Sequence, residues 1–256
     1  MTEEQVVATL GPEDSRVQEL FGDALPVVTA FAALLTEEGV RRGLIGPREV
    51  PRLWERHLVN SAAVAQFLPA WGSLLDVGSG AGLPGVVLAA MRPDLEVVLL
   101  DPMERRTTWL TEVLETLALT NARVVRGRAE ELHGTMMFSA VTARAVAPMD
   151  RLARWTLPLL GVDGVLLAMK GQQATAELEA AAETVRSLGG DTGEILEARS
   201  VSGLDGTTVV RVVRRTVTSL HATTAQPAAA AAAAPGVTPA APGRSTGRKG
   251  RRRTGR

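Results

Sequence analysis

Hydrophobic residues follow two different patterns in the first 220 residues, and both patterns stop after that point. Up to residue 70, apolar side chains recur at intervals of three or four, as in Val27, Val28, Phe31, Leu34 and Leu35. This spacing is typical of amphipathic helices with one buried face. The sequence therefore predicts an N-terminal helical cap over residues 1–70.

Between residues 71 and 220, short apolar runs alternate with longer helical segments. The runs predicted to be strands are 74–77, 97–100, 123–125, 140–143, 165–169, 194–201 and 207–214. The helices predicted between them are 84–91, 105–119, 128–132, 149–160 and 174–188. Alternation of this kind predicts an α/β domain whose mostly parallel, seven-stranded sheet is covered by helices on both faces. The turn sequence at 203–206 makes the last two strands a closing antiparallel hairpin, which we expect to place an antiparallel strand at one edge.

Residues 221–256 show neither pattern. Alanine, proline, threonine and glycine dominate there, and the run Ala228–Ala234 is too short to form a stable isolated helix. We interpret this segment as a disordered Ala/Pro linker that ends in a basic tail.

Composition excludes several classes of chemistry. The chain has no cysteine and only three histidines, far apart in sequence, so disulfides, cysteine nucleophiles and a metal site are not expected. No apolar stretch approaches the roughly 18–20 residues that span a bilayer, so no membrane association is expected. The segment Met1–Gln5 has no basic cluster typical of a signal peptide, and we expect a cytoplasmic protein.

The net charge of zero conceals two opposite halves. Residues 1–220 carry 21 basic and 28 acidic side chains, whereas residues 221–256 carry seven basic side chains and no acidic one. The basic tail, including Arg251, Arg252 and Arg253, is therefore a candidate for sequence-independent RNA binding. A solvated low-complexity end explains the same residues equally well.

The segment 74–85 carries the most specific motif, because a buried strand runs directly into a glycine-rich turn and then a helix. Such a unit marks a nucleotide-like cofactor site in an open α/β sheet. Gly80, Gly82 and Gly85 match the dinucleotide fingerprint. Asp76, Gly78, Gly80 and Gly82 instead match the first motif of S-adenosylmethionine (SAM) methyltransferases.

The methyltransferase alternative is preferred on electrostatic grounds. A carboxylate at Asp76 can face the ammonium of a methionine group, whereas it would repel a pyrophosphate. Asp101, at the end of the next strand, is placed to accept hydrogen bonds from ribose hydroxyls. The sequence predicts a Rossmann-like class I SAM-dependent methyltransferase.

The turn Gly78-Ser79-Gly80-Ala81-Gly82-Leu83-Pro84-Gly85 closely resembles the signature of a known family. This is the bacterial 16S rRNA methyltransferase G family, also called glucose-inhibited division protein B. Further matches follow in order at Arg56-His57-Leu58, Leu100-Asp101, Arg105-Arg106, Arg128-Ala129-Glu130-Glu131, Arg144-Ala145 and Lys170-Gly171. The chain departs from the family pattern at Asn60, where aspartate is usual, and at Ala81, where proline is frequent.

The resemblance implies methyl transfer from SAM to N7 of guanosine 527 in 16S rRNA, either naked or in the small ribosomal subunit. Guanine N7 has a lone pair and no proton to lose, so positioning matters more than a general base. No catalytic residue is assigned, and Arg144 and Lys170 are candidates for positioning. The implied cofactor residues are Asp76, Gly78, Gly80, Gly82, Leu83, Asp101, Ala129, Glu130 and Arg144.

The implied RNA contacts lie at Arg56, His57, Arg105, Arg106 and Lys170. For His57, a satisfied and partly buried side chain is the more frequent situation. Lys170 is the only lysine before the tail, which suggests a need for a compact ammonium, for example against an RNA phosphate.

Three other functions remain compatible with the sequence. The chain could methylate another RNA or a small molecule, bind NAD as an oxidoreductase through Gly80, Gly82 and Gly85, or bind RNA without catalysis. The oligomeric state does not follow from the sequence.

Overall fold

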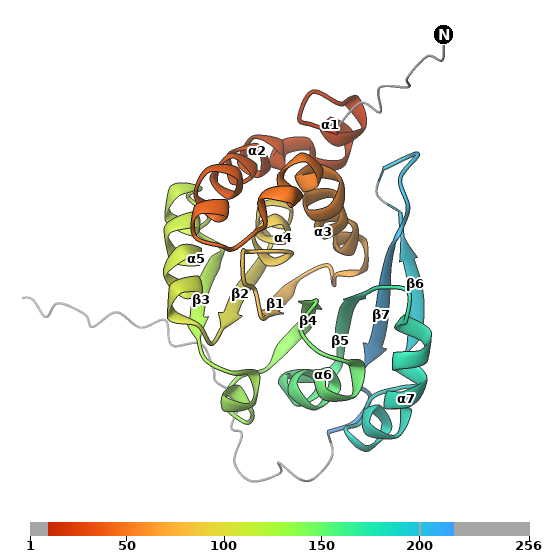
Figure 1. Cartoon of the computed structure of the whole chain (residues 1–256). Coiled ribbons are helices and arrows are strands. Elements are labelled where there is room, and N and C mark those ends of the chain that lie inside the picture. Colours follow the sequence, from red (N-terminus) through yellow and green to blue (C-terminus); the bar gives the residue numbers. More distant parts are fainter. Residues whose placement is uncertain (1–9, 200, 218–256) are drawn as a thin grey trace, which may run out of the picture. The chain divides into compact units, whose positions relative to one another are not determined.

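A single mixed sheet of seven strands organises the protein (Figure 1). The computed structural model describes residues 10–199 and 201–217. The strands are β1 (Gly72–Val77), β2 (Leu95–Asp101), β3 (Ala122–Arg126), β4 (Phe138–Arg144), β5 (Leu160–Lys170), β6 (Glu194–Ala198) and β7 (Thr207–Val213). Their order in the sheet is β3-β2-β1-β4-β5-β7-β6, with β1 to β5 parallel and β7 antiparallel to both of its neighbours. The predicted seven-stranded, mostly parallel sheet is confirmed.

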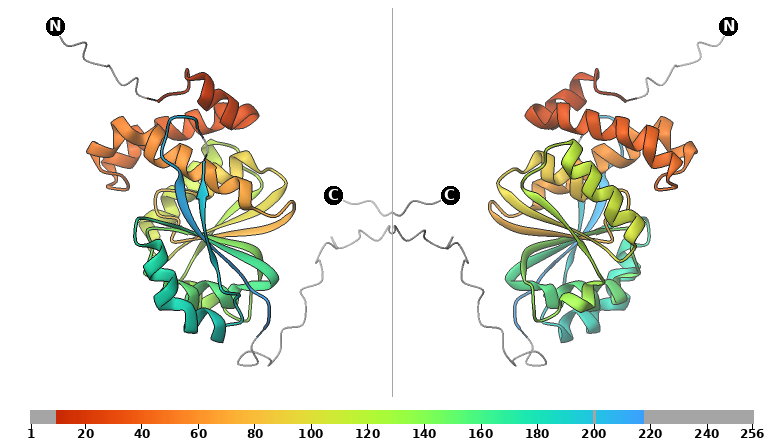
Figure 2. Two further views of the ribbon diagram at one scale, coloured as in Figure 1. Left: turned by 90° about the vertical axis from the view of Figure 1, so that its right-hand side faces the viewer. Right: turned by 90° about the vertical axis from the view of Figure 1, so that its left-hand side faces the viewer.

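Helices cover both faces of this sheet (Figure 2). The helices after β1 are α4 (Gly85–Met91), α5 (Glu104–Thr116), α6 (Met149–Thr156) and α7 (Ala174–Ser187), with short helices η6 (Ala129–Leu132) and η7 (Leu157–Leu159). Neighbouring residues on β1 point to opposite faces: Leu74 packs with α4 and α5, and Leu75 packs with α6 and α7. Two apolar layers therefore sandwich the sheet.

The N-terminal segment is helical and packs on the α4–α5 face. Its elements are α1 (Ser15–Phe21), η1 (Gly22–Ala24), α2 (Leu25–Leu34), η2 (Leu35–Gly39), η3 (Pro47–Arg52), η4 (Leu53–Val59), α3 (Asn60–Ala63) and η5 (Val64–Phe67). Phe31 and Leu58 are fully buried and belong to the same cluster as Leu74 and Leu99 of the sheet. The apolar core therefore runs continuously from these helices, the N-terminal cap, into the sheet.

One helical segment of this cap corrects an expectation from the sequence. By length and composition alone, the continuous segment Ser15–Gly39 is apolar enough to cross a membrane. The core of a folded domain produces such helices too, and Val17, Phe31 and Leu35 are buried in this core. The expectation from the sequence did not include this segment, because polar residues interrupt its run of apolar residues.

The predicted closing antiparallel hairpin is confirmed, but the position of its antiparallel strand differs from the prediction. The antiparallel strand β7 lies inside the sheet between β5 and β6, and β6 takes the edge. Strand β7 buries Val209, Val210, Val212 and Val213 on both of its faces, whereas β6 is mostly exposed. A strand buried on both faces is stable in the sheet interior, so the hairpin folds back and inserts its second strand there.

A further difference concerns the chain before β5. The helix predicted to end at residue 160 ends at Thr156, and β5 begins at Leu160, five residues earlier than predicted. Pro158 lacks the backbone N–H that would continue the helix. The predicted linker and basic tail, residues 221–256, lie outside the described residues, and the predicted domain boundaries stay predictions.

Candidate functional site

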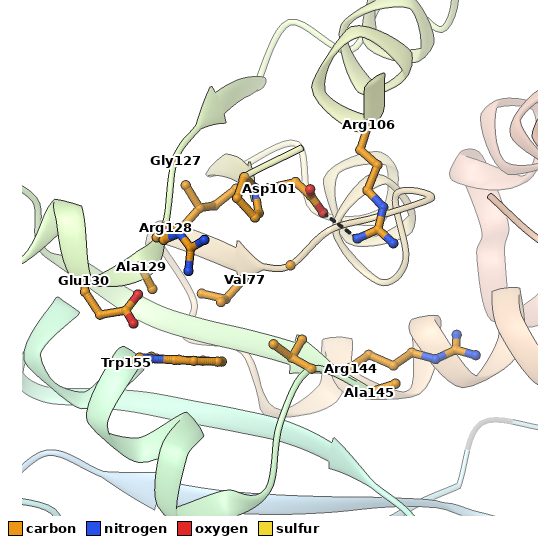
Figure 3. Close-up of a pocket in the computed structure, with 14 residues that line it drawn as sticks. Val77, Asp101, Arg106, Gly127, Arg128, Ala129, Glu130, Arg144, Ala145 and Trp155 are labelled. Atoms are coloured by element: carbon orange, nitrogen blue, oxygen red, sulfur yellow. Dashed lines mark hydrogen bonds and ion pairs between the residues drawn. The ribbon is translucent and has the colours of Figure 1, made fainter. Parts of the chain in front are cut away.

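The carboxyl ends of β1, β2, β3 and β4 surround a cavity of about 260 Å³ (Figure 3). Ligands in open α/β sheets bind at this edge. The cavity is lined by Val77, Gly78, Leu100, Asp101, Pro102, Arg106, Gly127, Arg128, Ala129, Glu130, Arg144, Ala145, Val146 and Trp155. Among the predicted cofactor residues, Gly78, Asp101, Ala129, Glu130 and Arg144 are therefore brought together here.

The glycine-rich turn after β1 has a conformation that side chains would not permit. Gly78 has a φ of +70°, and a Cβ there would lie 2.9 Å from Val146. Gly82 has a φ of +104°, and a Cβ there would lie 2.7 Å from Val86 and 3.0 Å from Phe31 of the cap. The turn is thus packed between β4 and the N-terminal helices, which brings its backbone close to the cavity.

Asp101 links this turn to the wall of the cavity. One carboxylate oxygen accepts from the amide of Gly80 at 3.1 Å and from Arg106 at 3.3 Å, and the other accepts from the amide of Met103 at 2.9 Å. The side chain is fully buried, so these three donors hold the carboxylate in one orientation. Arg106, predicted to contact RNA, pairs with Asp101 and lines this cavity, so its contact with RNA stays a prediction.

Asp76 lies behind the turn and does not line the cavity. Its Oδ2 accepts from the amide of Gly85 at 3.1 Å, whereas its buried Oδ1 has no hydrogen-bond partner. Burial raises the pKa of Asp76 to about 7, although hydrogen bonds from Ser79 and Gly85 oppose the shift. A carboxylate with an unsatisfied oxygen would gain from a cation nearby, which fits the predicted methionine ammonium.

Three predicted cofactor residues lie behind the residues that line the cavity. Gly80 and Gly82 do not line the cavity, although Gly80 holds Asp101 in place. Leu83 packs against the hydrophobic core and does not line the cavity either, so its apolar contact with the cofactor stays a prediction.

The far end of the cavity combines an aromatic ring with a carboxylate. Ala129 and Glu130 open η6, and Trp155 of α6 contributes its ring to the opposite wall (Figure 3). Trp155 escaped the sequence analysis because a tryptophan on a helix is most often a core residue. Its position beside Glu130 makes this end suitable for a flat heterocycle.

Arg144, at the end of β4, also lines a second cavity of about 770 Å³. That cavity is lined by Glu49, Arg56, His57, Asn60, Arg144, Ala145, Val146, Ala147, Pro148, Met169, Lys170, Gly171, Glu177 and Thr207. Arg144, Ala145 and Val146 line both cavities, so these are adjacent. Ala145 has a φ of +54°, a strained conformation that is frequent at functional sites.

Three of the predicted RNA contacts, Arg56, His57 and Lys170, line this second cavity. Lys170, however, donates to the carbonyl of Ala147 at 2.6 Å and to Glu177 at 2.7 Å, and its side chain is 9% exposed. Because its ammonium is already paired, the structure favours a structural role over contact with RNA phosphate. This corrects the earlier interpretation, which rested on residue type alone.

The remaining RNA candidates are placed as follows. Arg105 is exposed on α5 and does not line either cavity. Arg251, Arg252 and Arg253 lie outside the described residues. Between residues 10 and 217, residue 200 excepted, there is no group of three or more metal-ligating side chains.

The chemistry of the turn suits SAM better than a dinucleotide. A pyrophosphate needs free amides at the start of the helix. Here the amides of Gly80 and Gly85 already face the carboxylates of Asp101 and Asp76. The unsatisfied Asp76 oxygen behind the cavity, with Asp101 and Trp155 in its lining, fits a cationic amino-acid nucleoside.

Comparisons with known proteins agree on one family. A family model described as GidB, rRNA small subunit methyltransferase G, matches residues 25–201. A protein of Beutenbergia cavernae named ribosomal RNA small subunit methyltransferase G is 55% identical over 76% of this chain and 92% of its own length. A protein of the same name from Thermobifida fusca is 49% identical over 96% of this chain and 97% of its own length.

Among solved structures, a precorrin-6y C5,15-methyltransferase from Geobacter metallireducens covers 66% of this chain and 91% of its own, with 14% identity and a TM-score of 0.47.

Proposed function

The chain belongs to the GidB family of rRNA small subunit methyltransferases G, and from that membership we propose that it transfers a methyl group from SAM to N7 of guanosine 527 in 16S rRNA. The relatives' shared name supports methylation of small-subunit rRNA. The proposal adds to that name the cofactor SAM, guanosine 527 as the target nucleoside and N7 as the methylated atom.

The observation that supports SAM most directly is the cavity that brings Asp101, Glu130 and Trp155 together at the carboxyl ends of the strands. Asp76 lies behind this cavity, where its buried Oδ1 lacks a partner and burial raises its pKa to about 7, so a cation bound nearby would favour its carboxylate without touching it. SAM would supply both a cation and the methyl group. Asp101 would accept from the ribose hydroxyls, and Glu130 and the Ala129 amide would meet the adenine beside Trp155.

Methylation at N7 does not require a general base. The N7 lone pair attacks the methyl carbon, the carbon–sulfur bond breaks, and its electron pair stays on sulfur. The product is a cationic 7-methylguanine, so no proton has to leave. What this chain's residues must do is hold both reactants in line, and the adjoining second cavity gives an extruded base a place next to the cofactor.

The deciding experiment supplies isotopically labelled SAM with 30S subunits or naked 16S rRNA from a strain that lacks this methyltransferase. We expect label in 7-methylguanosine at position 527, located by mass mapping. Label at another nucleotide would replace the specificity proposed, and failure to bind SAM in calorimetry would remove the proposal altogether. NAD serves as the control ligand and should not bind.

We further propose that the basic tail strengthens RNA binding and that the enzyme works in the cytoplasm, where its substrate is assembled. A protein ending at residue 221 should bind 16S rRNA more weakly, with a flatter dependence of affinity on salt, because fewer counterions are released. Unchanged affinity and salt dependence would contradict the role of the tail. Cell fractionation with an antibody against the full chain tests the location.

A further inference from the structure

A chain of three side chains connects the N-terminal cap to the carboxyl end of β4. His57 of η4 lies in the middle. Its Nε2 is 2.8 Å from a carboxylate oxygen of Glu49, and its Nδ1 is 2.5 Å from Nη2 of Arg144. His57 and Arg144 are 87 positions apart in sequence, so only the folded protein joins them.

The partners of the ring define where its proton lies. A guanidinium can only donate, so the Nδ1 that faces Arg144 must carry a lone pair. A carboxylate accepts, so the Nε2 that faces Glu49 must carry the hydrogen. Both contacts together specify a neutral imidazole with its proton on Nε2, a tautomer that neither contact alone would determine.

Arg144 is held almost entirely by the cap. In addition to the ring, Nη2 donates to the carbonyl of Arg56 at 3.2 Å and Nη1 to that of His57 at 3.5 Å. Figure 3 shows the Arg144 side chain directed away from Asp101 and toward the N-terminal helices. Its guanidinium thus lies at the border of the two cavities, where the reactants would meet.

We propose that His57 is a positioning residue for the methyl transfer, acting as a neutral acceptor that orients the Arg144 guanidinium toward the RNA substrate, with Glu49 fixing its tautomer. The inference rests on the proposed function and adds to it the way the cap takes part in the reaction. Arg144, which lines both cavities, would contact the substrate, whereas His57 would act through Arg144.

A consequence of this arrangement is a dependence on pH. An imidazolium would direct an Nδ1–H at the Arg144 guanidinium, so protonation breaks the contact and adds repulsion. The charged groups that face His57 are Glu49 from η3, Arg56 from its own helix and Arg144 from β4. Burial, with the Arg144 charge, lowers the pKa of His57 below 6.5 although Glu49 opposes the shift, so the loss of orientation belongs to the acidic side of neutrality.

The decisive experiment compares two amides at position 57. His57→Asn places an amide oxygen near the Nδ1 position and can still accept from Arg144. His57→Gln places its amide near the Nε2 position, so it meets Glu49 and leaves Arg144 without its acceptor. We expect kcat/KM for RNA, at saturating SAM, to fall about tenfold for Gln and less than about threefold for Asn. The reverse order would overturn the proposal.

A double-mutant cycle shows whether His57 acts through Arg144. In an Arg144→Lys protein, the difference between Asn and Gln at position 57 should shrink to less than about twofold, because the guanidinium they orient is absent. Independent, multiplicative effects would mean that His57 acts on its own or only stabilises the fold, and would also overturn the proposal.

The pH profile provides a readout that a merely structural role would not move. The wild-type kcat/KM should decline below the pKa of His57, and the decline should be absent in His57→Asn. Glu49→Gln should move it to lower pH, since it removes the charge that favours protonation. Glu55→Gln, a half-exposed carboxyl of the same cap that pairs with Arg52, should leave it unchanged. A decline that persists in His57→Asn would contradict the role of this ring.

Each variant at positions 49, 55 and 57 is also tested for SAM binding by calorimetry and for thermal unfolding. We expect the SAM dissociation constant to stay within about threefold, because neither Asp101 nor the glycine turn lines the second cavity where His57 lies. If the wild type bound no SAM or modified no RNA, the proposed function would fail. If the wild type is active and all variants at position 57 match it, only the present inference fails.

Discussion

The two adjoining cavities are built in different ways, although they share three residues at the end of β4. The cofactor cavity is formed by turns that directly follow β1, β2 and β3. The second cavity is formed by the cap helices η3 and η4 together with the ends of β4 and β5. The comparison teaches that the first cavity is lined by strand ends and by α5, η6 and α6 without any cap residue, whereas the second takes part of its lining from the cap.

Their buried ionisable groups differ as well. On the cofactor side, burial raises the pKa of Asp76 to about 7. On the cap side, burial and Arg144 lower the pKa of His57. The folded state therefore binds an extra proton at Asp76 and lacks one at His57, so the two sides respond to pH in opposite directions.

The largest expected effect is the pH dependence of the unfolding free energy that Asp76 contributes. In the folded protein without cofactor, Asp76 keeps its proton up to about pH 7, whereas the unfolded chain loses it near pH 3.8. This group therefore favours folding at low pH, and its contribution disappears as pH rises through 7. Between pH 5 and 8 the unfolding free energy of the wild type, relative to Asp76→Asn, should fall by about 3 kcal/mol.

Urea denaturation at both pH values measures this difference. Asp94→Asn is the matched control, because Asp94 is half exposed, is paired with Arg92 and has a lowered pKa, so it does not titrate in this range. An identical pH dependence in Asp76→Asn and the wild type would contradict the raised pKa. The same variant should also lose the tightening of SAM binding that we expect as pH rises through 7.

A smaller effect concerns the cofactor cavity alone, because it should change the affinity for SAM and leave the affinity for RNA. Asp101→Asn removes the charge that accepts from Gly80, Met103 and Arg106. SAM binding should weaken by about 2 kcal/mol, or roughly thirtyfold, while RNA binding changes little. Calorimetry and filter binding give the two numbers. Glu104→Gln, an exposed carboxyl three positions away, should alter neither, and equal losses for SAM and RNA would break the separation between the cavities.

The next effect concerns the stability contributed by Lys170, which lines the second cavity. Lys170→Met removes the ammonium that joins the carbonyl of Ala147 to Glu177. Because Glu177 is partly exposed, we expect a loss of about 1.5 kcal/mol of stability rather than the full cost of an unpaired buried charge. The salt dependence of RNA binding should remain unchanged. A slope of log affinity against log salt concentration that is smaller by about one would instead support contact between Lys170 and an RNA phosphate. Arg199→Met, in an exposed ion pair, is the control.

The smallest effect concerns how the cap side supports the glycine turn. The indole of Trp109, in α5, donates to the carbonyl of Ala81 at 3.0 Å, and Arg42 of the cap stacks over its ring at 5.3 Å. Trp109→Phe should lower stability by about 1 kcal/mol and weaken SAM binding less than about threefold. Trp71→Phe, at an exposed position, should change neither in thermal unfolding or calorimetry. A large loss of SAM affinity would show that contacts from the cap are needed for ligand binding in the cofactor cavity as well as for the second cavity.

Local features of the sequence were sufficient for the sheet and for half of the cofactor site. The periods of 2 and 3.6 residues identify strands and helices because burial acts on neighbouring turns of the same element. The glycine turn and Asp101 could be predicted because each follows its own strand within a few residues. Their roles could be named because the order of motifs matched a family.

The tertiary structure alone decided the partners that are distant in sequence. It inserted β7 into the sheet, since four valines buried on two faces need neighbours on both sides. It paired Lys170 with Glu177, turned Trp155 into the cavity and joined His57 to Arg144. Residue type and spacing describe what a side chain can do, but register and helix packing determine which groups meet, and these depend on the whole core at once.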